Sequence, residues 1–370
     1  MLLNENKLDE PNVELGLSAS SKGAHFDQLL GNIPSTRYFG SKRKLIGWLV
    51  TLFNQLEFTT AADLFGGTAS VSLLLKYLGK QVTFNDVLVS NTIMARALLS
   101  NRIPISELRF KDVMDEIAPE EGFISKNFGG IFYTDEENQW LDGAISRISN
   151  LDTASQTALY YCLFQACLQK RPFNLFHRAN LSLRTAQTQV RTFGNLATWN
   201  THFSVHMQNS YGRLRKAICR SEHIHSVLPN QDAMSVKPGY DLVYLDPPYI
   251  NRSGQEDYLR MYHFLEGLAS GKAWSELINR SSKCLAFQNK PEIREWHKKS
   301  TFKEKLFELI RKHKKSIVVL SYASNAYPSI SDLEAFFAST FSKSRREQKE
   351  HRRVLSKQQT LETVLIGIPK

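Results

Sequence analysis

The stretch Asp241-Leu-Val-Tyr-Leu-Asp246-Pro247-Pro248-Tyr249 decides how the rest of the chain is interpreted. Residues 242–245 form a short apolar run, which is typical of a fully buried β-strand. Pro247 and Pro248 lack backbone N–H groups, so the ladder of strand hydrogen bonds ends at Asp246. A carboxylate and an aromatic ring therefore stand just beyond a buried strand, where open α/β sheets bind their ligands. An ordinary Asp-Pro turn is the plainer interpretation, but the complete Asp-Pro-Pro-Tyr sequence favours a functional site.

A second strand and turn lie upstream, at Asp63-Leu-Phe65-Gly66-Gly67-Thr-Ala-Ser70. The sequence predicts a strand that ends at Asp63, a glycine turn, and a helix whose apolar face runs from Val71 to Leu78 at helical spacing. A further strand over residues 81–84 then leads to Asp86. An acid roughly 20 residues beyond such a turn is placed to accept hydrogen bonds from the hydroxyls of a ribose. The unit therefore predicts a nucleotide-like ligand.

The segment Tyr38-Phe-Gly40-Ser41-Lys42 precedes this unit and predicts a glycine turn that feeds a basic helix. The free N–H groups at the start of a helix, with Lys42 beside them, suit a carboxylate. A merely basic first turn is the plainer alternative. Residues 1–33 are mostly polar and are expected to form a flexible N-terminal arm.

Composition narrows the class of protein. The 370 residues are 42% hydrophobic and 22% charged, as expected for a globular protein with one large or two ordinary domains. The net charge of +11 favours a polyanionic partner, although a basic enzyme without such a partner could carry the same charge. The four cysteines lack C-x-x-C spacing, which disfavours a structural zinc site and favours a reducing compartment. Because neither a signal peptide nor a membrane span is evident, the sequence predicts a cytoplasmic protein.

Residues 96–215 interrupt the alternation of strands and helices. Within them, a predicted helix over residues 151–169 leads into Lys170-Arg171-Pro-Phe-Asn174-Leu-Phe-His-Arg178-Ala-Asn180. Arginine and asparagine side chains can form paired hydrogen bonds with base edges, and lysine suits phosphate. We therefore expect contacts to DNA from Arg171, Asn174, Arg178 and Asn180, against the alternative of a solvated charged loop.

Three further strands are predicted, at residues 224–228, 316–322 and 361–368. Asp232 follows the first of them and borders the same predicted edge of the sheet. The polar and aromatic residues 250–263 predict a lid over the site. The cation-rich run 342–353 joins the last two strands and is either a solvated face or a phosphate contact. His223 and His225 lack further ligands nearby, so we expect no metal site.

The order of these motifs resembles that of the alpha group of adenine-N6 DNA methyltransferases, the Dam-like family. The Asp-Pro-Pro-Tyr stretch is similar to motif IV, the glycine turn to motif I and the segment with Lys42 to motif X, while Asp86 and Asp232 stand where motifs II and III carry an acid. Ala69 departs from the family, which usually has glycine there.

The resemblance implies a doubly wound α/β sheet of the S-adenosylmethionine-dependent methyltransferase type, with one reversed strand and an inserted, mainly helical target-recognition domain. The implied division is an N-terminal arm over residues 1–33, a first catalytic part over 34–95, the insert over 96–215 and a second catalytic part over 216–370.

The resemblance also implies the reaction and its residues. A methyl group passes from S-adenosylmethionine to the N6 amine of an adenine flipped out of double-stranded DNA. The Asp246 carboxylate and the Pro247 carbonyl accept the amine protons, and the Tyr249 ring stacks on the base. Lys42 and Tyr38 hold the methionine end, Asp86 the ribose and Asp232 the adenine of the cofactor. The catalytic set is Asp246, Pro247, Pro248 and Tyr249, and the cofactor-binding set is Tyr38, Gly40, Ser41, Lys42, Asp63, Phe65, Gly66, Gly67, Asp86 and Asp232.

Alternatives stay open at this stage. One is methylation of a different amine, on RNA adenine or on cytosine. Another is a nucleic-acid-binding module that kept the fold without activity, against which the intact acids and Lys42 argue. The sequence leaves open whether a cognate restriction endonuclease accompanies the chain, and neither a metal nor a membrane is expected.

Overall fold

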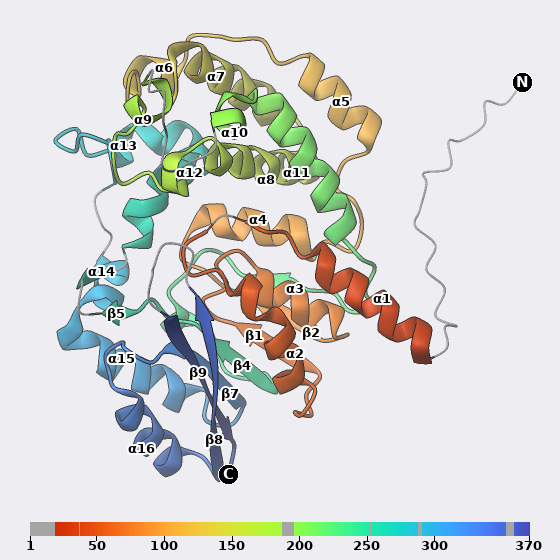
Figure 1. Ribbon diagram of the computed structural model, residues 1–370, viewed down its shortest axis with the longest axis vertical. Helices are drawn as coiled ribbons and strands as arrows, with labels where there is room; N and C mark the ends of the chain where they lie inside the picture. The colour runs from red at the N-terminus through yellow and green to blue at the C-terminus, as the bar shows by residue number, and fades with distance from the viewer. Residues whose placement is uncertain are drawn as a thin grey trace, which may run out of the picture.

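The computed structural model describes residues 19–36, 38–186, 196–251, 254–255, 257–287, 291–352 and 359–370. Its centre is a seven-stranded sheet in the order β3-β2-β1-β4-β7-β9-β8 (Figure 1). The strands are β1 (Thr60–Asp63), β2 (Gln81–Phe84), β3 (Ser226–Val227), β4 (Leu242–Leu245), β7 (Ile317–Ala323), β8 (Lys343–Arg352) and β9 (Gln359–Ile368). Neighbouring strands from β3 to β7 pair in parallel, whereas β9 runs antiparallel to both β7 and β8. The predicted doubly wound sheet with one reversed strand is thereby confirmed.

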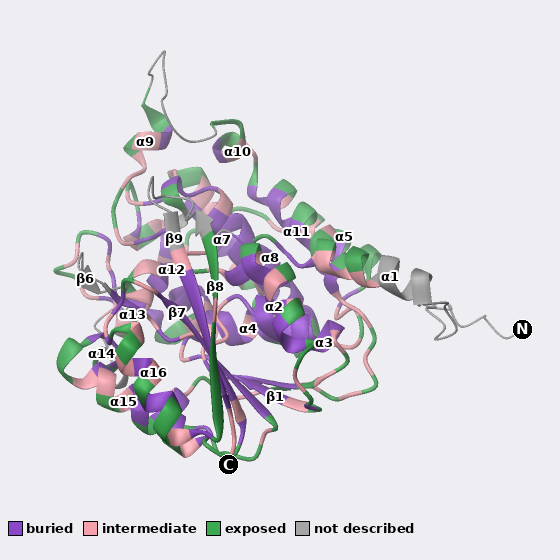
Figure 2. Ribbon diagram, turned by 60° about the horizontal axis from the view of Figure 1, so that its bottom comes forward, coloured by how far each residue is buried: buried purple, intermediate pink, exposed green. Residues whose placement is uncertain are grey.

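Helices cover both faces of this sheet. Leu242 and Tyr244 point into one apolar core, and the alternate residues Val243 and Leu245 point into the other, as successive residues of a strand must. The first core includes α2 (Ile46–Phe53), α3 (Ser70–Tyr77) and α4 (Val89–Leu99). The second includes α15 (Lys299–Lys312) and α16 (Ile330–Thr340). Burial on both faces explains why β4 is apolar throughout. Figure 2 shows the inner strand β7 in purple, as buried, and the edge strand β8 in green, as exposed.

The inserted segment forms a helical layer at the top of Figure 1. Its long central helix α8 packs against α4 of the catalytic part on one side and against α11 on the other. The layer contains α5 (Glu107–Asp115), α6 (Phe123–Asn127), α7 (Asp135–Ser149), α8 (Thr153–Gln169), α9 (Ser182–Thr185), α10 (Leu196–Asn200) and α11 (Phe203–Ala217). The segment after the Asp-Pro-Pro-Tyr turn contributes β5 (Ile250–Asn251), β6 (Gly254–Gln255), α12 (Tyr258–Ser270), α13 (Trp274–Leu277) and α14 (Pro291–His297).

Two predictions of irregular structure were wrong. Residues Ala19–Asn32, assigned to a flexible arm, form helix α1, which packs against α3 and α11. The cation-rich run that was expected to link two strands is itself the edge strand β8, paired along its length with β9. Charged side chains are typical of edge strands because they discourage pairing with another chain. Arg353 lies outside the described residues. No helix in the described part of the chain is long and apolar enough to cross a membrane.

Candidate active site

A pocket opens at the carboxyl ends of β1, β2 and β4, the edge at which parallel strands place their following loops. All of the predicted catalytic and cofactor-binding residues line it. They are Tyr38, Gly40, Ser41, Lys42, Asp63, Phe65, Gly66, Gly67, Asp86, Asp232, Asp246, Pro247, Pro248 and Tyr249. The structure therefore brings together motifs that lie far apart in the sequence.

The turn after β1 explains its glycines. A Cβ atom on Gly66 would lie 2.1 Å from the ring of Phe84, and Gly67 has a φ of +51°. Ala69, immediately before α3, also adopts the left-handed conformation, with φ 57° and ψ 19°. This conformation is strained for any residue with a Cβ atom, which accounts for the glycine usual at this position in the family that the chain resembles.

Asp63, one of the residues that line this pocket, has a carboxylate oxygen without a partner among the described residues. The residue is 1% exposed, and its Oδ2 accepts a hydrogen bond of 2.7 Å from the Ser72 hydroxyl. Oδ1 is buried and has no hydrogen-bond partner among the described residues. Burial, with smaller effects from Asp246 and Asp86, raises the pKa of Asp63 to about 7. A cationic or hydrogen-donating ligand group would satisfy this oxygen.

The other two predicted cofactor acids already hold protein partners. Asp86 accepts the backbone N–H groups of Gly67 and Leu88, each at 2.8 Å, and burial raises its pKa. Asp232 accepts from Trp296 Nε1 at 2.9 Å and from Lys305 Nζ at 2.7 Å. Both carboxylates are thereby oriented at the pocket wall. Asp86 also shapes the glycine turn, because it accepts the Gly67 N–H.

Aromatic rings line the two ends of the pocket. The Tyr38 ring stacks on Tyr262 with centroids 4.0 Å apart, and its hydroxyl accepts from Asn91 Nδ2 at 3.2 Å. Phe65 meets Trp296 edge-to-face, with centroids 5.0 Å apart. Trp296 is a pocket residue that the sequence analysis missed, since α14 shows no motif.

The Asp-Pro-Pro-Tyr turn, which is the predicted catalytic turn, is held by Lys42, a residue from a distant part of the sequence. Lys42 lies in a short 3-10 helix, η1 (Lys42–Leu45), and its Nζ donates to Asp246 Oδ1 at 2.7 Å and to the Tyr249 hydroxyl at 2.9 Å. The Tyr249 hydroxyl lies 2.8 Å from the same Oδ1. Lys42 was expected to hold the methionine end of the cofactor, but its ammonium donates to the Asp246 carboxylate. The Tyr249 hydroxyl is therefore a hydrogen-bonding group of this turn in addition to the ring for which a stacking role was expected.

The two oxygens of Asp246 therefore differ. Oδ1 is occupied by Lys42 and Tyr249, whereas Oδ2 has no hydrogen-bond partner within the described ranges, and the side chain remains 17% exposed. Burial raises the pKa of Asp246, although the adjacent Lys42 ammonium opposes the rise. One anchored and one open oxygen is the arrangement expected of a carboxylate that accepts a proton-bearing group from the pocket.

Glu362, on β9, completes this cluster and was missed. Its Oε1 accepts from the Ser321 hydroxyl at 2.7 Å and lies 3.1 Å from the Tyr249 hydroxyl and 3.3 Å from Lys42 Nζ. The only signal in the sequence was a single acid near the start of an otherwise apolar final strand. Its partners come from η1, the catalytic turn and β7, so no local pattern could identify them.

Arg171 has a different position from the one predicted. It is 1% exposed, and its guanidinium donates to the carbonyls of Phe132, Leu175 and Arg178. This burial contradicts a direct contact with DNA, because the side chain has no free surface to present. Arg171 instead holds the loop that follows α8 from inside.

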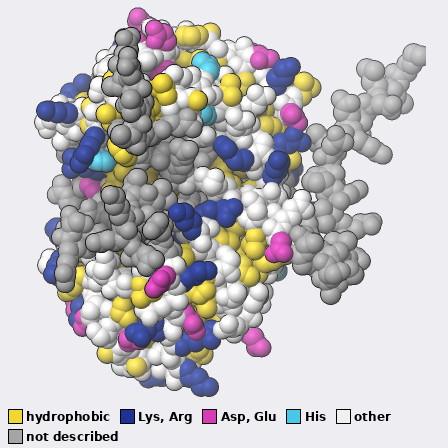
Figure 3. All heavy atoms as spheres, in the orientation of Figure 1, with side chains coloured by type: hydrophobic (Ala, Val, Ile, Leu, Met, Phe, Trp, Pro, Cys, Tyr) yellow, Lys and Arg dark blue, Asp and Glu magenta, His cyan; other side chains and the backbone are white. Residues whose placement is uncertain are grey.

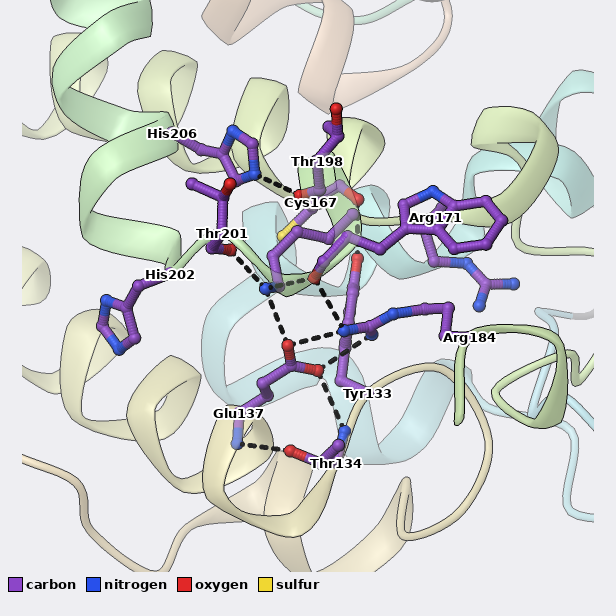
Figure 4. Close-up of polar contacts among 12 residues, drawn as sticks. Tyr133, Thr134, Glu137, Cys167, Arg171, Arg184, Thr198, Thr201, His202 and His206 are labelled. Carbon is purple, nitrogen blue, oxygen red and sulfur yellow. Dashed lines mark hydrogen bonds and ion pairs between the residues drawn. The ribbon is translucent and has the colours of Figure 1, made fainter. Parts of the chain in front are cut away.

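Neighbouring cations of the insert also hold this part of the chain through buried contacts (Figure 4). Glu137 accepts from Lys170 Nζ at 2.7 Å and from both terminal nitrogens of Arg184, at 2.9 and 2.7 Å. Lys170 also donates to the carbonyls of Trp199 and Thr201. This buried network ties α7, α8, α9 and α10 together and orients the loop that follows α8.

Arg178 lies in the same loop and, unlike Arg171, is exposed. It lines an open polar recess together with His177, Arg260, Asn279, Ser282 and Lys283. Asn180 is half-buried, and its Oδ1 has no partner among the described residues. The Asn174 side chain lies outside the part of the chain that can be described. Of the two loop aromatics, Phe173 is 47% exposed, whereas Phe176 is buried and stacks on Phe264.

The cations of β8 divide into two groups. Lys349 pairs with Glu362 on the neighbouring strand β9 and therefore lies level with the Glu362 contacts described above. Lys343 pairs with Ile368 at the far end, about 20 Å away at the usual strand rise per residue. Lys and Arg side chains recur across the face shown in Figure 3.

Comparison with known proteins shows which family of enzymes this chain is similar to. The family model for D12 class N6 adenine-specific DNA methyltransferase matches residues 38–316. The chain is also similar to Type II methyltransferase M2.HphI of Haemophilus parahaemolyticus, with 27% identity over 312 residues that cover 82% of this chain and 88% of that protein. These findings confirm the predicted enzyme class, a site-specific DNA-methyltransferase acting on adenine. The chain belongs to the family of D12 class N6 adenine-specific DNA methyltransferases.

Proposed function

We propose that the pocket binds S-adenosylmethionine and that Asp246 accepts a proton of the N6 amine of an adenine flipped out of double-stranded DNA. The observation that carries this proposal is the pair of unsatisfied carboxylate oxygens in one pocket, Asp63 Oδ1 and Asp246 Oδ2. The first suits a cation, and the second suits a proton donor at the reacting centre.

The residues present fit the cofactor. The buried Asp63 oxygen suits the ammonium of its methionine portion, Asp86 has lone pairs left for ribose hydroxyls, and Phe65 and Trp296 offer apolar surface to an adenine ring beside Asp232. When bound, the cofactor supplies an electrophilic methyl group. Lys42 stays with Asp246 in this assignment, because its ammonium already has the catalytic turn as its partner.

The Asp-Pro-Pro-Tyr turn then makes the adenine amine a better nucleophile. The exocyclic amine of adenine is a poor nucleophile because its lone pair is delocalised into the ring. Asp246 Oδ2 and the Pro247 carbonyl, which is not needed for a strand ladder, each accept one N–H and so direct the lone pair away from the turn. The Tyr249 ring, 5% exposed, supplies the face for the base.

DNA lies across the recess that Arg178 lines. The cations Arg178, Arg260 and Lys283 line this recess together with one acid, Asp257, so its lining carries a net positive charge that suits a DNA backbone or base edge. A cognate restriction endonuclease is the proposed functional partner, on the ground of the similarity to a Type II methyltransferase.

Methyl transfer from tritiated S-adenosylmethionine to duplex DNA tests the proposal, with nucleoside analysis of the product. Wild type should produce N6-methyladenine, and Asp246→Asn should lose activity while it keeps its affinity for the cofactor in calorimetry. Label in methylcytosine, label in RNA alone, or full activity of the Asn variant would each overturn it.

A further inference from the structure

Glu362 lies beside the catalytic turn but outside residues 38–316, the part matched by the family model. It is 1% exposed, on the reversed strand β9, opposite Ala323 of β7. Its Oε1 makes three polar contacts with described residues: the Ser321 hydroxyl, the Tyr249 hydroxyl and Lys42 Nζ. The Glu362 side chain therefore contacts Lys42 and Tyr249, the two groups that hold Asp246.

The charge balance of this cluster is unusual for a purely structural arrangement. A buried carboxylate is costly unless a cation pairs with it, and here Asp246 and Glu362 share the single ammonium of Lys42. Lys42 and Asp246 alone would form a balanced pair. The second carboxylate adds buried negative charge, and such a cost is tolerated mainly where function requires it.

Glu362 also controls how strongly Lys42 neutralises Asp246. An ammonium shared between two carboxylates screens each of them less than it would screen one. The Tyr249 hydroxyl has a single proton, which Asp246 and Glu362 both approach within hydrogen-bonding distance. The position of that proton, and with it the orientation of the Tyr249 ring, depends on both acids.

We propose that Glu362 is a positioning residue for methyl transfer, which shares Lys42 with Asp246 and fixes the Tyr249 hydroxyl so that Asp246 presents one open, incompletely neutralised oxygen to the adenine amine. The inference rests on the role proposed above for Asp246.

A pH dependence follows from the sharing of Lys42. Burial raises the pKa of Asp246, and the charge of Glu362 raises it further. Burial lowers the pKa of Lys42, but the charges of Asp246 and Glu362 outweigh burial, so the pKa of Lys42 is raised. Removal of the Glu362 charge should therefore lower both pKa values, and both limbs of the pH–rate profile should move to lower pH. The other titratable or polar groups that face the pair are Asp63 on β1, Tyr244 on β4, Tyr249 in the turn and Ser321 on β7.

The test is single-turnover methylation of duplex DNA at saturating S-adenosylmethionine, measured as a function of pH. Glu362→Gln keeps the shape without the charge, and its rate should fall by about 10²-fold, the cost of a small misplacement of a reacting group, with the profile moved to lower pH. Glu362→Asp keeps the charge but shortens the side chain, so its rate should fall while the profile stays in place. Thr363→Val, a buried neighbour on β9, is the matched control and should match wild type.

Three outcomes would overturn the inference: a Glu362→Gln profile that superimposes on that of wild type, a Glu362→Asp rate equal to wild type, or a loss of cofactor affinity that accounts for the lower rate. Thermal melting shows which variants fold, and Glu362→Asp decides the question if the Gln variant does not. Full activity of Asp246→Asn would instead remove the proposed role of Asp246 itself, so the two failures can be distinguished.

Discussion

Asp63→Asn should raise the free energy of unfolding and, at the same time, lower the affinity for S-adenosylmethionine. The two side chains have the same shape, so Ser72 can still donate to an oxygen at this position, while an amide NH₂ replaces the unpartnered Oδ1. Because burial raises the pKa of Asp63 from 3.8 to about 7, ionisation of this carboxyl opposes folding near neutral pH.

The sign and size of the effect follow from that pKa. At a pH below the unfolded value of 3.8, the carboxyl is protonated in both states and contributes nothing. As pH rises toward 7, the unfolded chain releases this proton and the folded protein retains it, so wild-type stability falls. Above the folded pKa, the full penalty is about 4 kcal/mol, at roughly 1.4 kcal/mol for each unit of pKa difference. Asparagine does not ionise, so the variant should gain stability over wild type by up to this amount.

Urea unfolding without cofactor, on either side of pH 7, measures the gain. Asp241→Asn is a control of opposite sign, because Asp241 accepts the backbone N–H groups of Thr60 and Thr59, which lower its pKa. That variant should lose stability at neutral pH. Calorimetry should show that Asp63→Asn binds S-adenosylmethionine roughly 10- to 150-fold more weakly, the loss of one charge-assisted hydrogen bond.

Two results would refute this reasoning. If the stabilities of wild type and Asp63→Asn ran parallel through the titration range, the buried carboxyl would impose no penalty on the fold. If the variant bound the cofactor as tightly as wild type, the unpartnered oxygen would not be a ligand-binding group.

Four further outcomes are expected. Tyr249→Phe should slow single-turnover methylation roughly 10- to 150-fold through its lost hydroxyl, and Tyr249→Ala should lose a further ~1–3 kcal/mol of stacking; a fully active Phe variant would leave the hydroxyl without a role. Ala69→Gly should raise the free energy of unfolding by up to about 1.5 kcal/mol, because relief of left-handed strain (~1–2 kcal/mol) exceeds the added chain entropy (~0.4–1 kcal/mol); urea unfolding would contradict this if the variant were less stable. Lys349→Gln should reduce the slope of log DNA affinity against log salt by about 0.9, whereas Lys343→Gln, on the same face of β8, should leave it unchanged. A wild-type slope for both variants would show that neither lysine contacts a phosphate. Arg178→Ala should cost about 1–3 kcal/mol in binding assays and relax preference at one base pair, and a uniform loss across sequences would indicate a phosphate contact instead.

Local patterns predicted the sheet well, and the motifs that they marked line one pocket. The strands at residues 81–84 and 242–245 have the bounds that their apolar runs predicted, because a strand buried on both faces leaves a continuous apolar signature. Glycine and proline then marked the ends of strands, and the carboxyl ends of parallel strands lie at one edge. Weakly apolar elements were harder to predict: β8 has an entirely polar sequence and forms a strand only because β9 offers it a partner.

The sequence by itself determined the order of the motifs, the parallel sheet and the acids at its edge, since each depends on residues close together in the chain. Only the tertiary structure decided what each charged side chain does. Arg171 and Arg178 lie in the same basic loop, yet one is buried against backbone carbonyls and the other is exposed. Lys42 and Glu362 meet from opposite ends of the chain at the catalytic turn. A buried charge is stabilised by whichever partners packing brings within a few ångströms, and those partners are set by the fold as a whole and not by neighbouring residues.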